Sequence, residues 1–369
     1  MKILVTGAKG FIGKNLCVFL SEQQHEVLEV NRETEEKDLV SYLSSTDIVF
    51  HLAGANRPID PSDFQTDNVD TTQFITDILL KSNRRIPVVL ASSIQAEDDN
   101  EYGVSKYAAE KIVRSYSIAT GAAYYIYRLP NVFGKWCKPN YNSFIATFCS
   151  NLQKGLDISV HDFDAQVRLA YIDDVCAAFM GLLNGKASSG FQKLPIEYNT
   201  TVGEVANIIL SFATSPTTLI IERVGTELTR ALYATYLSYT PPHKFKQSIP
   251  NHEDKRGVFC EMLKTKDSGQ FSFFTAHPGI TRGGHYHHTK NEKFLVVKGE
   301  AIFKFRNIIT GDTHELKVND SKPEIVKTVP GWAHDITNSG DEELIVMLWA
   351  NEIFDIQKPD TISNELFDV

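Results

Sequence analysis

Three groups of residues in this sequence have the types and the spacing that chemistry requires. Ser93 ends an apolar run, and Tyr102 and Lys106 follow it, four positions apart. A glycine-rich segment, 6–13, lies near the start of the chain, and three histidines with a glutamate lie between residues 285 and 334. These groups predict carbonyl reduction, phosphate binding and metal binding, respectively.

Tyr102 and Lys106 have the spacing of an acid–base pair. On a helix, residues four apart share a face, so the ammonium of Lys106 lies near the phenol of Tyr102. We expect this cation to lower the pKa of the phenol from its ordinary value of about 10. Tyr102 can then protonate a carbonyl oxygen as a hydride reaches the carbon, while Ser93 polarises the same carbonyl.

The glycine-rich segment occupies an expected strand-to-helix turn, between a strand at 2–6 and a helix at 11–23. Glycine lets the backbone turn tightly and approach a pyrophosphate, which the free N–H groups and the helix dipole attract. The context therefore predicts a dinucleotide-binding site, formed by Gly7, Lys9, Gly10, Phe11, Ile12 and Gly13.

The end of the second expected strand bears on the choice of dinucleotide. Such folds usually place an acid there to hold the adenosine ribose, whereas this sequence has Asn31 and Arg32. An arginine at this point, with Lys9 from the glycine loop, suits a 2′-phosphate. We therefore expect NADP(H) rather than NAD(H), with a solvated surface role for Arg32 as the alternative.

The hydrophobic pattern divides the chain into two regimes. Up to about residue 240, short apolar runs (2–6, 26–30, 48–52, 87–91, 124–128) alternate with helical periods (11–23, 35–43, 62–82, 102–120, 143–154, 174–183, 202–212). This alternation predicts an α/β fold with a doubly wound parallel sheet. From about 253 the runs are short and rich in glycine and proline, which predicts an all-β sandwich or barrel. The expected boundaries are 1–243, a linker at 244–252, and 253–369.

Composition limits the classes of function. The 369 residues are 42% hydrophobic, carry a net charge of −9 and show no basic cluster, so we expect neither disorder nor a nucleic-acid partner. The chain opens directly on a strand-like run and has no 18-residue apolar stretch, which predicts a cytoplasmic protein with no membrane partner. Five cysteines without a CxxC pair indicate buried, reduced thiols.

Residues 1 to about 240 resemble the extended short-chain dehydrogenase/reductase family. The resemblance rests on the glycine loop, Ser92-Ser93, Tyr102 and Lys106, and on four further matches: His51-Leu52-Ala53-Gly54, Asn68, 128–134 and 171–175. It implies a Rossmann-like fold that acts on nucleotide-linked sugars, with Leu52, Ala53, Gly54 and Asn68 at the cofactor and Asn131 at the substrate. Arg168 is one residue from a position where the family often has a diphosphate-binding arginine, so substrate and surface roles stay open.

Two departures from that family change what we expect of the reaction and of the sheet. Ile94-Gln95 follow Ser93 where sugar-nucleotide dehydratases carry an Asp-Glu pair, which disfavours dehydration. The segment between the second expected strand and Ile48 is short, so one strand of the usual sheet is expected to be missing or vestigial.

The β-rich region holds an expected metal site. His285 and His287 point to the same face of a strand because the side-chain period is two, whereas His288 points away. With Glu292 and the distant His334 they can surround one divalent ion, for which Zn²⁺ is the favoured identity.

The spacing of these residues resembles both signature motifs of the cupin superfamily, which have a jelly-roll fold. The segment Arg282-Gly283-Gly284-His285 also resembles cupin-type deoxysugar epimerases, in which the matching histidine is a base rather than a ligand. We favour a bound metal because all four candidate ligands are present. An epimerase base outside that set is then needed, and Tyr286, Lys304 and Asp335 are guesses.

The order of the two regions, reductase then cupin, resembles CapF-type enzymes of capsular polysaccharide synthesis. That resemblance implies C3 epimerisation of a UDP-linked 2-acetamido-2,6-dideoxy-4-keto-hexose, followed by NADPH-dependent C4 reduction to UDP-2-acetamido-2,6-dideoxy-L-talose, on the route to UDP-N-acetyl-L-fucosamine. The order is chemically required, because reduction removes the carbonyl that acidifies C3–H. Alternatives are a single-activity reductase or a 4-epimerase, with the cupin as a binding or dimerisation module. A homodimer is expected from family habit.

Overall fold

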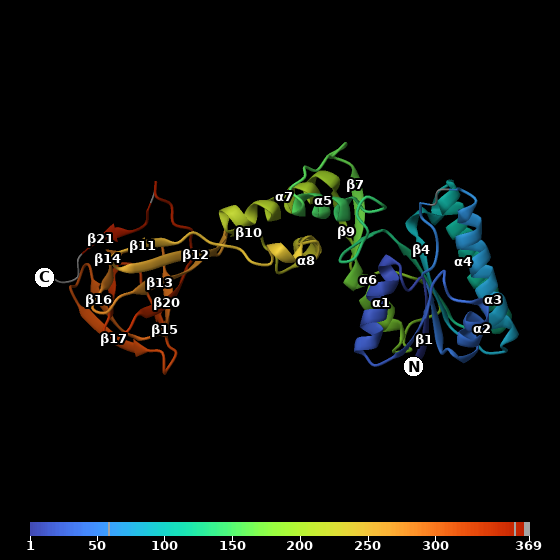
Figure 1. The fold of residues 1–369 in the computed structure, drawn as a ribbon, viewed down its shortest axis with the longest axis horizontal. Coiled ribbons are helices and arrows are strands. Elements are labelled where there is room, and N and C mark those ends of the chain that lie inside the picture. Colours follow the sequence, from blue (N-terminus) through green and yellow to red (C-terminus); the bar gives the residue numbers. More distant parts are fainter. Residues whose placement is uncertain (58–59, 358, 365–369) are drawn as a thin grey trace. The chain divides into compact units, whose positions relative to one another are not determined.

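The computed structural model describes residues 1–57, 60–357 and 359–364. The chain divides into two compact units (Figure 1), the first made of Met1–Leu210 and Thr226–Thr240 and the second of Ser211–Gly225 and Pro241–Val369. The segment 211–225, which the sequence analysis placed in the first domain, thus packs within the second unit. The predicted fold class, a parallel α/β domain followed by an all-β domain, is confirmed.

The first unit is built on a six-stranded sheet whose neighbouring strands all run parallel. Its order is β2-β1-β3-β4-β5-β8. The strands are β1 (Lys2–Thr6), β2 (Glu26–Val30), β3 (Ile48–His51), β4 (Val88–Ser93), β5 (Tyr124–Leu129) and β8 (Gly190–Gln192). Within the described residues β2 forms the sheet edge, so the missing strand expected from the short segment before Ile48 is confirmed.

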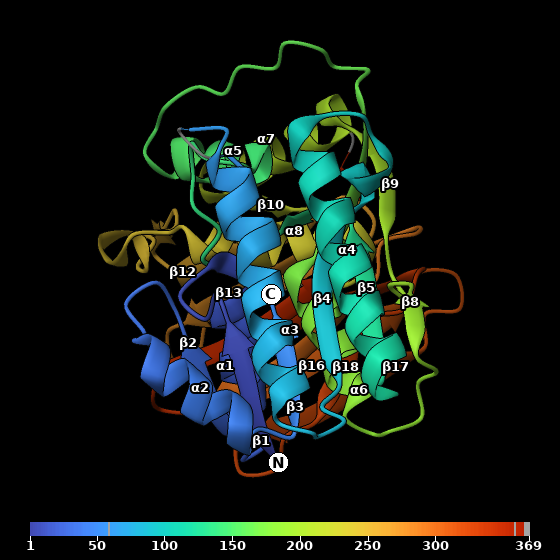
Figure 2. The same cartoon turned by 90° about the vertical axis from the view of Figure 1, so that its right-hand side faces the viewer.

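Helices cover both faces of this sheet, as expected for a parallel sheet with crossover connections (Figure 2). The helices of the unit are α1 (Phe11–Glu22), α2 (Glu36–Ser45), α3 (Thr71–Lys81), α4 (Glu101–Thr120), α5 (Phe144–Gln153), α6 (Ile172–Leu182) and α8 (Glu227–Ser238), with short turns η1 (Gln65–Asp70) and η2 (Ile94–Glu97). Figure 1 shows α2, α3 and α4 on one side of the sheet and α1 and α6 on the other. Aliphatic side chains such as Leu4, Val49, Leu79 and Ile126 fill the core between sheet and helices.

A small three-stranded sheet completes the unit beyond the carboxyl end of β5. It pairs β6 (Asn131–Phe133) with β7 (Gln166–Tyr171) in parallel and β7 with β9 (Tyr198–Thr201) in antiparallel fashion. From β9 the chain enters α7 (Val202–Thr218), which begins in the first unit and ends in the second.

The second unit consists of two mostly antiparallel sheets. The first has the order β10-β12-β13-β20-β15-β18, with β11 paired to β12, and the second has the order β17-β16-β19-β14-β21. The strands are β10 (Ile220–Ile221), β11 (His252–Asp254), β12 (Gly257–Thr265), β13 (Gly269–Ala276), β14 (Thr281–Tyr286), β15 (Glu292–Lys298), β16 (Glu300–Asn307), β17 (Thr313–Asn319), β18 (Ile325–Lys327), β19 (Trp332–Asn338), β20 (Leu344–Ala350) and β21 (Ile362–Ser363), with η3 (Pro242–Lys244) before them.

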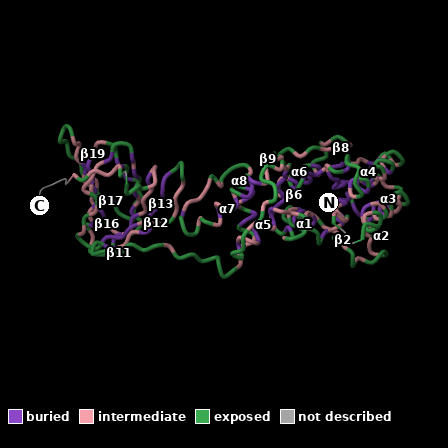
Figure 3. Tube along the Cα trace, turned by 90° about the horizontal axis from the view of Figure 1, so that it is seen from above, coloured by how far each residue is buried: buried purple, intermediate pink, exposed green. Residues whose placement is uncertain are grey.

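The two sheets of this unit share one apolar core. Phe274, Phe294 and Val346 from the first sheet meet Phe303 and Ile336 from the second. Figure 3 shows buried residues gathered along the strands of this unit, with exposed residues in its connecting loops. The histidines predicted to bind a metal lie on β14, directly after it and on β19, next to this core.

Candidate active site and metal centre

The glycine loop between β1 and α1 has a backbone that only glycine can supply. Gly7 has φ of +66°, and a Cβ there would lie 2.8 Å from the backbone nitrogen of Ala53. A Cβ on Gly13 would lie 2.2 Å from the carbonyl oxygen of Gly7. The loop therefore packs backbone to backbone, which leaves its free N–H groups at the amino end of α1 for an anion.

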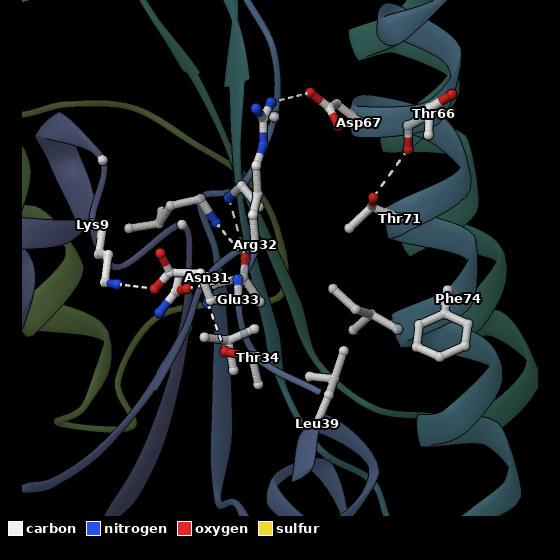
Figure 4. A pocket seen from close by; sticks show the side chains of 18 of the residues that line it. Lys9, Asn31, Arg32, Glu33, Thr34, Leu39, Thr66, Asp67, Thr71 and Phe74 are labelled. Atoms are coloured by element: carbon white, nitrogen blue, oxygen red, sulfur yellow. Dashed lines mark hydrogen bonds and ion pairs between the residues drawn. The ribbon is translucent and has the colours of Figure 1, made fainter. Parts of the chain in front are cut away.

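A cavity of about 710 Å³ opens beside this loop, over the ends of β1 and β2 (Figure 4). The loop following β2 lies on one wall and the helical segment containing Asp67 and Phe74 on the other. Arg32 donates to Asp67 at 2.7 Å, and Lys9 donates to Glu33, which holds the pKa of the Glu33 carboxyl below its ordinary value. The cavity thus contains two cations and two acids in pairs, and the predicted residues Asn31, Leu52, Ala53 and Gly54 also line it.

A second cavity, of about 490 Å³, continues from the same glycines toward the carboxyl ends of β4 and β5. Its lining brings Ser93, Tyr102 and Lys106 together with Asn131 and with the distant glycine loop. Phe11, Ile12 and Gly13 lie on its opposite part, at the start of α1. The two cavities share Gly7, Lys9 and Gly10, so together they have the layout of a dinucleotide site that ends at a reaction centre.

Tyr102 and Ser93 line the same part of this cavity, and the Ser93 hydroxyl acts on the Tyr102 phenol. Burial raises the pKa of the Tyr102 phenol, and the hydrogen bond to Ser93 acts in the opposite direction. The expected lowering of this pKa by Lys106 is not observed, because burial dominates the shift and the Lys106 ammonium donates to the Ala91 carbonyl. Tyr102 is accordingly protonated at neutral pH and is ready to donate.

Lys106, one helical turn after Tyr102, points into the protein. Its Nζ donates to the backbone carbonyl of Ala91 at 2.7 Å, and the residue is only 7% exposed. Burial lowers the pKa of Lys106 to about 8, while the nearby Glu110 acts to raise it. The ammonium thus lies close to its titration range near neutral pH.

Asn68 acts on the site through the loop after β3. Its side chain donates to the Ala55 carbonyl at 3.0 Å and to Ser105 Oγ at 2.9 Å, and it accepts from the Ala55 nitrogen at 2.9 Å. A Cβ on Gly54 would lie 2.4 Å from Asn68 Oδ1. Asn68 is absent from the described residues that line the two cavities, so the structure places it behind Gly54 and Ala55, and its cofactor role stays a prediction.

The described lining of the two cavities does not include Arg168. This residue lies on β7 and is paired with Glu197, and its backbone carbonyl accepts from Asn131 Nδ2 at 3.5 Å. The substrate and surface roles that the sequence analysis left open both stay predictions. The lining instead includes Asn56, Trp136, Lys138 and Tyr141, which sequence reasoning missed. The available signal was the aromatic and basic run that follows Asn131-Val132-Phe133-Gly134.

In the second unit, the four predicted metal ligands converge from three places in the chain. Within the described residues, one ligand atom from each of His285, His287, Glu292 and His334 lies within 4.8 Å of the others. Glu292 Oε2 is 3.3 Å from His287 Nε2 and 3.4 Å from His334 Nε2. His285 and His334 are register partners across β14 and β19, which explains how residues 49 positions apart meet.

The electrostatics of this cluster suit a divalent cation. Burial lowers the pKa of His285 to about 4, so its imidazole is neutral and available as a ligand. Burial alone would raise the pKa of Glu292, but His287, His334 and Lys290 hold the carboxyl ionised, with a pKa well below the ordinary value. His334 Nε2 is buried and has no hydrogen-bond partner in the described chain. Three imidazoles and a carboxylate with such an orphaned nitrogen fit zinc or a similar ion.

Asp360 holds the loop between the ligands His287 and Glu292. Its carboxylate accepts from the backbone nitrogens of His288, Thr289 and Lys290 at 2.8, 2.7 and 2.8 Å. Its own carbonyl accepts from His287 Nδ1, which leaves Nε2 facing the cluster. Sequence reasoning missed this residue, because nothing local marks a partner more than 70 positions away.

Two of the three guesses for an epimerase base face away from the cluster. Lys304 and Asp335 oppose each other across β16 and β19, one position from Phe305 and His334. Because successive strand residues alternate faces and Phe305 belongs to the core, Lys304 and Asp335 lie on the outer face. Tyr286 pairs with Ile362, with its ring centroid 5.6 Å from that of His288, the histidine expected to point away from the metal.

Comparison with known proteins gives two family matches. The NAD dependent epimerase/dehydratase family matches residues 3–193, and the polysaccharide biosynthesis C-terminal domain matches residues 252–362. No helix in the described part of the chain is long and apolar enough to span a membrane.

Relatives match over the whole chain. The sequence is 52% identical over 363 residues to the UDP-2-acetamido-2,6-beta-L-arabino-hexul-4-ose reductase of Pseudomonas aeruginosa, covering 98% of each chain. The structure superposes on the capsular polysaccharide assembling protein CapF of Staphylococcus aureus with a TM-score of 0.92 and 41% identity, covering 99% of this chain and 100% of that one. A structure of CapF with the inhibitor 3-isopropenyl-tropolone gives a TM-score of 0.87 at 37% identity, over 99% of this chain and 100% of that one.

Proposed function

The chain belongs to the NAD dependent epimerase/dehydratase family, in the two-domain form that CapF represents, and from this premise we propose a two-step activity on a UDP-linked 4-keto sugar. The second unit inverts C3 of a UDP-2-acetamido-2,6-dideoxy-4-keto-hexose, and the first unit then reduces C4. The product is UDP-2-acetamido-2,6-dideoxy-L-talose. The observation that carries the proposal is the single cavity that Ser93, Tyr102 and Lys106 line together with the glycine loop.

In the reduction, Ser93 and Tyr102 hold the C4 carbonyl oxygen by hydrogen bonds. NADPH, when bound, supplies the hydride that reaches C4. Tyr102 donates its phenolic proton to the oxygen as negative charge develops there, and Ser93 stabilises that charge. Lys106, one helical turn after Tyr102, is an ammonium and favours the phenolate that proton donation leaves behind.

The residues of the first cavity favour the phosphorylated dinucleotide. Arg32 follows β2 and Lys9 belongs to the glycine loop, both line the first cavity, and each has an acid partner, Asp67 or Glu33. Anion binding at this point replaces a carboxylate partner with a phosphate. The glycine loop binds the pyrophosphate through its free N–H groups.

In the second unit, His285, His287, Glu292 and His334 would hold one divalent ion, zinc being the best fit to three nitrogens and one oxygen. Such an ion would supply a Lewis acid for a ketone or enolate oxygen. Inversion at C3 precedes reduction, since the C3–H is acidic only while C4 is a ketone. A homodimer and a cytoplasmic location remain predictions.

The experiment uses full-length protein, a UDP-linked 4-keto-6-deoxy-N-acetylhexosamine and NADPH in deuterated water. We expect the wild type to consume NADPH and to yield a talose-configured product with deuterium at C3, measured by NMR. Tyr102→Phe should consume no NADPH yet still incorporate deuterium at C3. Tyr107→Phe, on the neighbouring exposed position of α4, is the matched control and should retain both activities.

Two outcomes would contradict the proposal. Loss of deuterium uptake in folded Tyr102→Phe would show that both steps share one site. Turnover of the wild type without net NADPH consumption would instead indicate a 4-epimerase that holds its nicotinamide throughout the cycle.

A further inference from the structure

Glu110 is a buried carboxylate for which the proposed reduction has no use. It lies on α4 one helical turn beyond Lys106 and is only 1% exposed. Its Oε1 accepts from Ser92 Oγ at 2.5 Å and from Arg128 Nε at 2.9 Å, and its Oε2 accepts from Arg128 Nη2 at 2.8 Å. A buried charge costs free energy unless it is fully paired, so the Glu110 carboxylate requires its partners Ser92 and Arg128.

The hydrogen bonds of Glu110 connect the elements that carry the reductase residues. Ser92 belongs to β4 and precedes Ser93 directly, while Arg128 belongs to β5 and lies three positions before Asn131. Arg128 also pairs with Glu97 of η2, the turn that follows Ser93. Loss of Glu110 would therefore remove the side-chain hydrogen bonds that join β4 and β5 to α4, which presents Tyr102 and Lys106.

The charges around Lys106 give Glu110 a second effect. From β3, His51 lies near Lys106 as a neutral imidazole, because burial and then the Lys106 charge together lower its pKa to about 3. From β5 comes the guanidinium of Arg128, whose other carboxylate partner, Glu97, is largely exposed to water. Burial favours loss of the Lys106 proton, and Glu110 is the carboxylate that opposes it.

We propose that Glu110 is a positioning residue of the reductase, which locks the ends of β4 and β5 to α4 and keeps Lys106 protonated during turnover. This inference rests on the proposed function of the first unit. It predicts that Glu110, which contacts neither sugar nor dinucleotide, shifts the alkaline limb of the pH profile of the reduction.

Glu110→Gln tests the proposal, because the amide has nearly the same shape but no charge. We expect the alkaline limb of the pH profile for NADPH oxidation to move to lower pH by about one unit, since an opposite charge at this range shifts a pKa by about 1–3 units. Activity near pH 6 should be largely retained. Glu110→Asp should restore the wild-type limb, and Glu97→Gln, which removes the exposed partner of Arg128, should leave it unchanged.

Arg128→Gln gives a second test with the opposite sign. It removes the guanidinium that pairs with Glu110, so the carboxylate acts more strongly on Lys106 and the alkaline limb should move to higher pH. This test remains even where Glu110→Gln fails to fold. A folded Glu110→Gln with the wild-type pH profile would overturn the inference, as would limbs that move in the same direction in both variants. Wild-type protein that oxidises no NADPH would refute the proposed function instead.

Discussion

Replacement of Asp360 tests how the second unit prepares its metal site. The carboxylate accepts three backbone N–H bonds and one from Thr289 Oγ1, all from the loop between the ligands His287 and Glu292. Asp360→Ala removes all four, so the carbonyl that orients His287 is then held only through the neighbouring pairing of β21 with β14. Loss of such an orienting partner typically costs about 10–100-fold in metal affinity, which equals about 1.4–2.7 kcal/mol. We expect the lower part of this range, since the His287 hydrogen bond itself is made by the backbone.

The assay is calorimetric titration of Zn²⁺ into chelator-treated full-length protein. Asp320→Ala is the matched control, because it removes a similar loop-holding carboxylate that accepts from the Gly299 nitrogen at 2.8 Å, away from the ligands. Equal zinc affinity of Asp360→Ala and the wild type would refute the positioning role. A wild-type protein that takes up no zinc would refute the metal site itself.

Three further predictions concern the first unit. Arg32→Ala should raise KM for NADPH about tenfold or more, since a hydrogen bond to a charged group contributes about 1.5–3 kcal/mol, and should leave KM for NADH unchanged; equal effects on both in steady-state kinetics would contradict the assignment. Gly13→Ala should abolish measurable NADPH binding by fluorescence titration, because its Cβ would lie 2.2 Å from the Gly7 carbonyl, whereas Gly181→Ala on α6 meets nothing within 4 Å and should bind normally. Burial lowers the pKa of His51 to about 3, so between about pH 6.5 and pH 3 the unfolded chain binds the extra proton and stability falls with falling pH, by about 1.4 kcal/mol per unit. His51→Gln should lack this component in urea unfolding across that window, and an unchanged pH dependence would show that His51 does not cause it.

The parts of the site that local rules govern were predictable from the sequence. The strand-to-helix glycines need only their order, and the Tyr102–Lys106 pair needs only the helical period. His285 and His287 share a face because strands alternate, although the bulge just before His285 was not predicted. Gly283 and Gly284, with φ of +105° and +74°, shift the register of β14 within the sheet.

The features that depend on tertiary contacts were not predictable. The segment 62–82 was expected to be one α-helix, whereas residues Gln65–Asp70 form the wider π-helical turn before α3 begins. The hydrogen bonds of Asp360 and of Glu110 join residues that are far apart in the sequence. In the sequence, both acidic residues resemble ordinary surface residues. The choice of cavity-lining residues after Asn131 likewise depends on how the loop containing Trp136 folds back.

The path of the backbone limits how this molecule can be dissected. The chain leaves the first unit at Leu210, returns at Thr226 and departs again after Thr240, so no single cut yields two complete halves. A C-terminal fragment starting at Pro241 would lack β10, whose Ile220 and Ile221 border Lys264 and Thr265 of β12. This edge of β12 would then expose unpaired amide and carbonyl groups, with which another copy of the fragment can pair. Fragments that retain 211–225 through a fusion or a circular permutation avoid the defect.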